Sequence, residues 1–200
     1  RAARVRNMIA QQDGTKAAFF GFQDRFRAFP GDYSRASTNI KCPTMPTCYD
    51  GTGDGLITVD TVANETAIVW LHLSSAGFLN GSYTMTSRTQ ENNADNTPRN
   101  PYNMYMQFIH DNVFQDTTSP APVKLNLKTG SQIPVEILAE IERKVDDGNA
   151  QRGQFRFSQY ASEIPAATPP APAGTGACTN DTGTWTVTEG VGNCGGASLF

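Results

Sequence analysis

The stretch "FRAFPGDYSRA", residues 26–36, constrains the fold more than any other feature, because it ends a long helical pattern abruptly. Upstream of it, large apolar residues recur mostly at helical spacing: Val5, Met8, Ile9, Phe19, Phe20, Phe22 and Phe26. A residue before proline is disfavoured in the α region, so we expect the helix to end at Phe29-Pro30. Gly31 then predicts a turn, so the sequence indicates an amphipathic helix followed by an ordered loop.

Chain length sets the expected domain organisation. The 200 residues suit one domain with one hydrophobic core, divided into a helix over residues 1–29 and a head over residues 30–200. With 18 glycines and 12 prolines, the composition favours a loop-rich α+β fold over a helical bundle. We therefore expect a long N-terminal helix packed on an antiparallel sheet with ordered loops.

Downstream periodicity predicts the remaining elements. Helices are expected at residues 61–75 and 132–148, the second ended by Gly148. Alternating apolar residues predict strands at residues 103–110, 123–127, 153–160 and 184–190. The proline-rich segment 164–177 lacks periodicity and indicates an exposed loop or extended arm.

Four cysteines form two pairs that are close in sequence: Cys42 with Cys48, and Cys178 with Cys194. Neither pair has the C-x-x-C spacing of a structural zinc site. Proximity favours two local disulfides over the other pairings that four cysteines allow. Disulfides in turn indicate an oxidising compartment.

Charge and motifs argue against several classes of function. The net charge of −3 gives no basic footprint for bulk nucleic-acid binding. No G-x-S-x-G, phosphate-binding glycine loop or H-E-x-x-H is present. His72, beside Trp70 in an apolar segment, is expected to be a half-buried packing residue, so the sequence indicates no enzyme.

The segment "DGTGDGLI" is a candidate calcium loop. Asp50, Thr52 and Asp54 alternate as in the first half of an EF-hand loop, but the twelfth position is Thr61 where that loop has glutamate. The alternative is a turn whose carboxylates accept hydrogen bonds from backbone amides, and this alternative is favoured.

A second acidic motif, Asp146-Asp147-Gly148, follows the expected late helix. Calcium is one interpretation of it. The favoured interpretation is a turn held by salt bridges, for which the nearby cations are Arg143, Lys144 and Arg152.

The order of these motifs resembles that of the type IV pilins and pseudopilins of bacteria. The most specific pieces are Phe29-Pro30-Gly31-Asp32, Trp70-x-His72-Leu73 followed by Ala76-Gly77, and Asp146-Asp147-Gly148. The resemblance implies a pilin-like head behind a spine helix and a structural subunit of a pilus or pseudopilus. It also implies that Pro30-Gly31 stands where the spine helix enters the head. Some pseudopilins bind calcium in their heads, so the resemblance also allows a calcium site.

The chain opens with "RAARVRNMIA", without the basic leader and apolar segment of that family. We expect that a longer helix was cut here. By resemblance, the absent segment would anchor the protein in the inner membrane before assembly and form the filament core. Copies of the chain and related pilins would be its partners, in an extracellular pilus or in the periplasm.

Two alternative functions stay open at this level. One is a minor pilin that binds DNA, a glycan or a receptor. The other is a free extracellular module whose binding depends on calcium.

Overall fold

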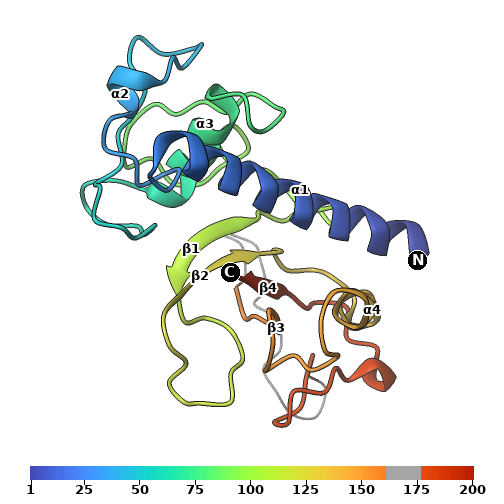
Figure 1. Cartoon of the computed structure of the whole chain (residues 1–200). Coiled ribbons are helices and arrows are strands. Elements are labelled where there is room, and N and C mark those ends of the chain that lie inside the picture. The colour runs from blue at the N-terminus through green and yellow to red at the C-terminus, as the bar shows by residue number, and fades with distance from the viewer. Residues whose placement is uncertain (161–176) are drawn as a thin grey trace. The chain divides into compact units, whose positions relative to one another are not determined.

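The computed structural model describes residues 1–160 and 177–200. It contains the helices α1 (Ala2–Phe26), α2 (Ala36–Asn39), α3 (Glu65–Ser75) and α4 (Val135–Val145), the short 3-10 helix η1 (Val187–Glu189), and the strands β1 (Gln107–Asp111), β2 (Lys124–Lys128), β3 (Phe155–Phe157) and β4 (Gly196–Leu199) (Figure 1). The expected α+β class is confirmed. The expected arm at 164–177 lies, except for Ala177, outside the described residues.

The chain divides into two compact units. The sheet unit consists of Arg1–Gln12, Arg99–Gln107 and Asp111–Phe200, and the loop unit consists of Asp13–Pro98 and Phe108–His110. Helix α1 contributes its first half to the sheet unit and its second half to the loop unit.

One face of α1 is buried along nearly its whole length. The buried positions include Val5, Met8, Gln12, Thr15, Phe19 and Phe22, which are spaced three or four residues apart, and Ala18 beside them. Phe19 and Phe22 are core residues, and Phe26 is half-buried. Gln12 and Thr15 are polar but buried. The apolar residues alone therefore mark only part of the face of α1 that is packed against the protein.

Helix α1 ends earlier than the sequence predicted. Its last residue is Phe26, whereas Phe29-Pro30 was the expected end. Arg27 has a φ of 55° and its amide donates to the carbonyl of Gln23 at 2.8 Å. A left-handed residue directly after the last turn is a common helix terminator, so the chain leaves the helix before it reaches the proline.

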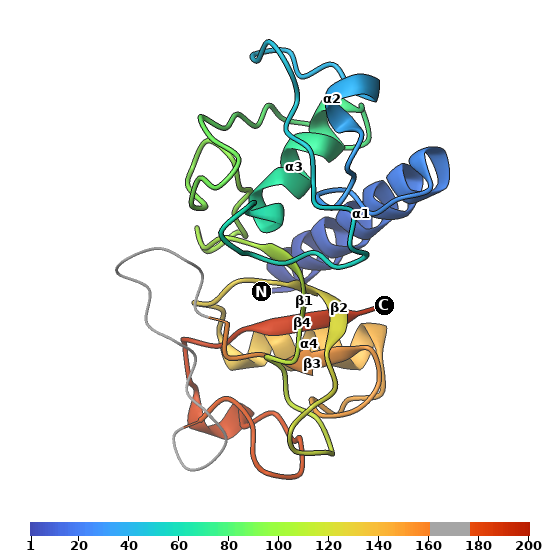
Figure 2. The ribbon, with the colours of Figure 1, turned by 90° about the vertical axis from the view of Figure 1, so that its left-hand side faces the viewer.

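The strands form one sheet in the order β1-β2-β4-β3, and β4 runs antiparallel to both β2 and β3 (Figure 2). Strand β4 was not predicted, because Gly-Ala-Ser-Leu carries no alternating apolar pattern. Gly196 has a packing reason to be small: a Cβ there would lie 2.6 Å from the ring of Phe155. The C-terminal segment therefore supplies an inner strand of the sheet.

The strand predicted at residues 184–190 is wrong. Trp185 makes an isolated bridge with Thr179, and the following residues form η1. Gly190 closes this turn with a φ of 64°, a conformation that glycine adopts without strain. The threonine and valine content that suggested a strand thus belongs to a short turn.

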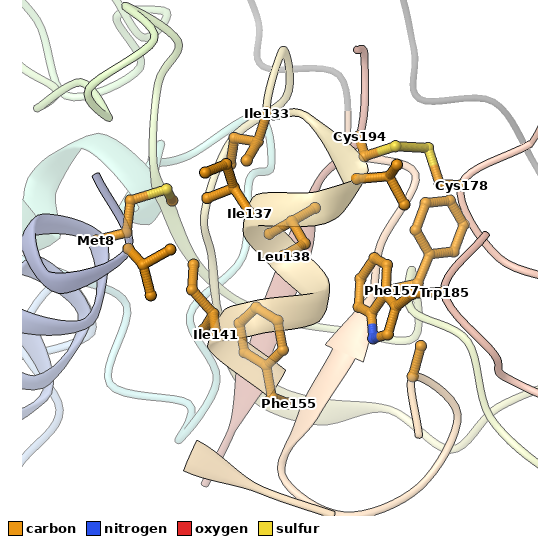
Figure 3. Close-up of a cluster of buried hydrophobic side chains, with 13 residues drawn as sticks. Met8, Ile133, Ile137, Leu138, Ile141, Phe155, Phe157, Cys178, Trp185 and Cys194 are labelled. Carbon is orange, nitrogen blue, oxygen red and sulfur yellow. A yellow bond between two sulfur atoms is a disulfide. The ribbon is translucent and has the colours of Figure 1, made fainter. Parts of the chain in front are cut away.

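The core of the sheet unit lies between α4 and β3 (Figure 3). Ile137, Leu138 and Ile141 form the buried apolar stripe of α4, whereas Val145, which has the same spacing, is exposed. Around them are packed Met8, Ile133, Phe155, Phe157 and Trp185, together with the disulfide Cys178–Cys194. Gly148 follows α4 with a φ of 84°, which fits its expected place in the turn after the helix.

Both local disulfides are present. Cys42 bonds to Cys48 with their Cα atoms 5.1 Å apart, and Cys178 bonds to Cys194 with their Cα atoms 5.8 Å apart. Each bridge closes a loop within one unit. The preference for sequence proximity is confirmed.

Among the residues described, no helix combines the length and the apolar character that a membrane span requires.

Candidate functional site

Three carboxylates meet beside the turn that follows α1, and we call them the turn cluster: Asp32, Asp54 and Glu65. Asp32 follows Gly31, Asp54 lies in the glycine-rich loop, and Glu65 begins α3. One carboxylate oxygen from each lies within 4.8 Å of the others. Asp32 and Glu65 are buried and Asp54 is exposed, so the cluster opens to solvent on the Asp54 side.

Asp32 organises the glycine-rich loop around its carboxylate. Its Oδ1 accepts the amides of Gly53 at 3.0 Å and Asp54 at 3.1 Å, and its Oδ2 accepts the amide of Gly55 at 2.9 Å. Gly53 and Gly55 have φ values of 74° and 84°, which let successive N–H groups point toward one anion. The alternative interpretation of this segment, an Asp/Gly turn bonded to backbone amides, describes the observed contacts of Asp32.

Glu65 fixes the same loop from the start of α3. Its Oε2 accepts the Thr52 amide at 3.0 Å and the Thr52 hydroxyl at 3.2 Å, and its Oε1 accepts the Thr58 amide at 3.2 Å. Burial raises the pKa of Glu65 to about 7, against the effect of these amide hydrogen bonds. The loop is therefore held by two buried carboxylates.

The other two carboxylates of the turn cluster respond to different surroundings. Burial raises the pKa of Asp32 above its ordinary value. The amide of Leu56, which donates to Asp54 Oδ1 at 3.0 Å, lowers the pKa of Asp54. Asp54 thus carries the ionised, solvent-facing charge of the cluster.

The structure brings together only part of the predicted calcium loop. Thr52 and Asp54 lie in or against the turn cluster, but the carboxylate of Asp50 accepts the amide and hydroxyl of Ser37 at 2.7 and 2.9 Å. Asp32 and Glu65 were not predicted as members of this site. Their signals were an aspartate directly after the Pro-Gly turn and an acidic residue in the first turn of a helix. Calcium at Asp50, Thr52 and Asp54 stays a prediction.

His72 locks the turn from the other side. Its Nδ1 accepts the Gly31 amide at 2.9 Å and its Nε2 donates to the carbonyl of Tyr49 at 2.7 Å. Burial lowers the pKa of His72 to about 4, and the ring stacks on Phe22 of α1. His72 is completely buried, not half-buried as expected, and both ring nitrogens are engaged by the backbone. It is a structural link between α1, the turn and α3.

A hollow of about 380 Å³ lies next to the turn cluster. Its lining includes the rings of Phe26, Phe29 and Tyr33, the cations Arg27 and Arg35, and Asp32. The combination of aromatic faces and guanidinium groups offers mixed apolar and polar contacts to a ligand or a neighbouring chain.

A second group of acids, the α4 cluster, consists of Glu142, Asp146 and Asp147 at the end of α4. The salt-bridged turn expected here is wrong: within the described ranges, Asp146 and Asp147 form no ion pair, and Arg143 and Lys144 instead pair with Glu140. Asp146 Oδ2 accepts the amide of Phe155 at 2.7 Å, and Asp147 Oδ1 accepts the amide of Asn149 at 2.9 Å. Backbone amides, not cations, hold this turn.

Comparison with protein-family models, with curated proteins and with solved structures finds no match to the chain. What the chain does is therefore inferred from its own residues and geometry.

Proposed function

We propose that the chain is the head region and adjoining spine helix of a structural subunit of a type IV pilus or related pseudopilus. The subunit assembles with copies of itself, and its role is mechanical rather than catalytic. One observation carries this proposal: α1 is a helix of 25 residues whose buried face runs from Val5 to Phe22 and which ends at a turn anchored in the head. In the proposed filament, a helix anchored in this way would hold the head at a fixed position relative to the filament core.

The anchoring contacts involve two of the three motifs that carry the resemblance, Phe29-Pro30-Gly31-Asp32 and Trp70-x-His72-Leu73, together with the glycine-rich loop and Glu65. Gly31 donates to His72, and Asp32 binds the glycine-rich loop that Glu65 also holds. These motifs are far apart in sequence, yet they form one hydrogen-bonded junction behind the end of α1. The contacts support the proposal that these motifs occur in one sequence because together they fix the end of α1.

The outward face of α1 supports a role in helix stacking. Its exposed positions include the small residues Ala3, Ala10, Gly14 and Ala17, and the ring of Phe20 is 50% exposed. Small residues let a second helix approach closely, and an exposed aromatic ring supplies apolar area to bury. In the proposed filament, this face meets neighbouring subunits.

The gene sequence upstream of the codons for this chain, together with deletion of the gene, tests the proposal. We expect a short basic leader upstream, followed by about 20 apolar residues, enough to span a bilayer. Deleting the gene is expected to remove a filament or to block secretion through a pseudopilus. An ordinary cleavable signal peptide, together with an unchanged deletion strain, would contradict it.

A further inference from the structure

Glu142, on the last turns of α4, is completely buried and lacks hydrogen bonds. Within the described part of the chain, neither Oε1 nor Oε2 has a hydrogen-bond partner. Leaving a charged group buried without a partner is costly, and native proteins rarely retain one without a reason. Glu142 therefore calls for a partner that the described residues do not supply.

Two further carboxylates converge on Glu142. One oxygen from each of Glu142, Asp146 and Asp147 lies within 4.8 Å of the others. Burial, and after it the negative charges of Asp146 and Asp147, raise the pKa of Glu142 to about 8. The described residues place no cation in an ion pair with any of the three.

The nearest N–H donors do not satisfy the carboxylate of Glu142. The N–H groups of Trp185 and Gly148 are close enough to lower the pKa of Glu142. Neither makes a hydrogen bond of normal geometry with it, and the indole Nε1 of Trp185 is itself buried without a partner. The indole alone would satisfy only one of the four lone-pair sites of the carboxylate.

The two aspartates are held in place by their other oxygens. The amides of Gln154 and Phe155 bind Asp146 Oδ2, and the amide of Asn149 binds Asp147 Oδ1. Gly153 makes room for Asp146, because a Cβ at Gly153 would lie 2.3 Å from Asp146 Oδ2. Among the described residues, Asp146 Oδ1 and Asp147 Oδ2 accept no hydrogen bond, so these oxygens are left to face a ligand.

We propose that the α4 cluster binds a hard divalent cation, calcium, through Glu142, Asp146 and Asp147, with water completing the coordination shell. Calcium takes six to eight oxygen ligands and accepts irregular geometry, which matches carboxylates from a helix and the loop after it. Zinc would prefer histidine or cysteine ligands, and the cluster has none. The C-terminal end of a helix also favours a cation. This inference is independent of the filament proposal.

Calorimetric titration of the oxidised chain with CaCl2, and thermal melts in CaCl2 and in EDTA, test the site. At a calcium concentration a hundredfold above Kd, the melting temperature should rise by about 5 °C or more, because calcium binds only the folded state. The Glu142→Gln variant should lose this rise, and in EDTA it should melt at or above the parent, since the substitution removes a buried acidic group whose ionised form has no partner among the described residues. Glu140→Gln, on the same helix but outside the cluster, should respond to calcium as the parent does.

A second variant keeps the proposal testable if Glu142→Gln does not fold. Asp147 is exposed, so Asp147→Asn should fold normally and bind calcium at least tenfold more weakly. Terbium, a calcium analogue, should give luminescence sensitised by the nearby Trp185, and calcium should quench it by displacement.

Three results would overturn the proposal. The first is a parent chain that shows no calcium response, and the second is a full calcium response in both Glu142→Gln and Asp147→Asn. The third is a response that is lost only in Asp54→Asn, which would assign calcium to the turn cluster.

Discussion

At the scale of single residues, His72 explains how the end of α1 is fixed. One ring nitrogen accepts the Gly31 amide and the other donates to the Tyr49 carbonyl, so the neutral form protonated on Nε2 fits both contacts. A second proton on Nδ1 would remove the acceptor that Gly31 needs. The folded chain therefore disfavours protonation of His72, which agrees with its pKa of about 4.

This contact predicts a loss of stability in acid. The unfolded chain takes up a proton at His72 near pH 6.5, whereas the folded chain does so only near pH 4. Stability is thus lost as the pH falls from 6.5 to 4, by about 3 kcal/mol. His72→Gln should be less stable than the parent by about 2 kcal/mol at pH 7.5, and its deficit should shrink or reverse at pH 4.

Urea unfolding of both proteins across this pH range measures the difference. The comparison between the two proteins is needed because Glu65, with a pKa of about 7, contributes the opposite slope between pH 4.5 and 7. Asp50 is the charged group that acts on His72 and raises its pKa slightly. A deficit that stays constant with pH would show that His72 is not held neutral by its contacts.

Residue-level prediction from the sequence succeeded where the relevant partners are neighbours. Cys42 and Cys48 are close in the chain, so proximity alone identified the bridge. Asp32 and Glu65 were missed as one site because their meeting depends on a turn and a helix that only the folded chain brings together. Asp50 was included because spacing does not show which way a carboxylate points, and it points to Ser37.

At the scale of elements, the two glycines in α1 stand in different surroundings. A Cβ at Gly14 would meet no atom within 4 Å, whereas a Cβ at Gly21 would lie 2.9 Å from the ring of Phe78. Glycine inside a helix costs stability relative to alanine, so its retention at Gly21 has a packing reason that Gly14 lacks.

Alanine substitutions at Gly14 and Gly21 are predicted to change the stability of the chain differently. Gly14→Ala should raise the free energy of unfolding by about 0.5–1 kcal/mol through helix propensity. Gly21→Ala should gain nothing or lose stability, because the Phe78 ring must move. Denaturant midpoints at constant m-value give both numbers. Equal gains at the two positions would contradict the packing of Phe78 against α1.

The same scale shows where periodicity stops being informative. Helix α4 could be predicted because large apolar residues recur in it at helical spacing: Ile137, Leu138 and Ile141. Strand β4 has small residues between neighbours on both sides, so burial leaves no alternation to recognise. Helix α1 was recognised, but its end was misplaced because a non-glycine residue, Arg27, takes the left-handed conformation.

At the scale of the whole molecule, composition and periodicity were enough to predict the α+β class. They could not predict the two compact units, because the segments that make up each unit alternate along the chain. They also could not predict the α4 cluster as a site, since its meaning depends on the burial of Glu142 without a hydrogen bond.

We propose that this chain is part of a filament subunit, and electron microscopy tests this proposal most directly. Cells that make the full-length protein would be labelled with gold-coupled antibodies raised against this chain. We predict gold particles along surface filaments, or along periplasmic filaments in opened cells, and the loss of both label and filaments after deletion of the gene. Label confined to dispersed single molecules, with filaments unchanged by the deletion, would contradict the account.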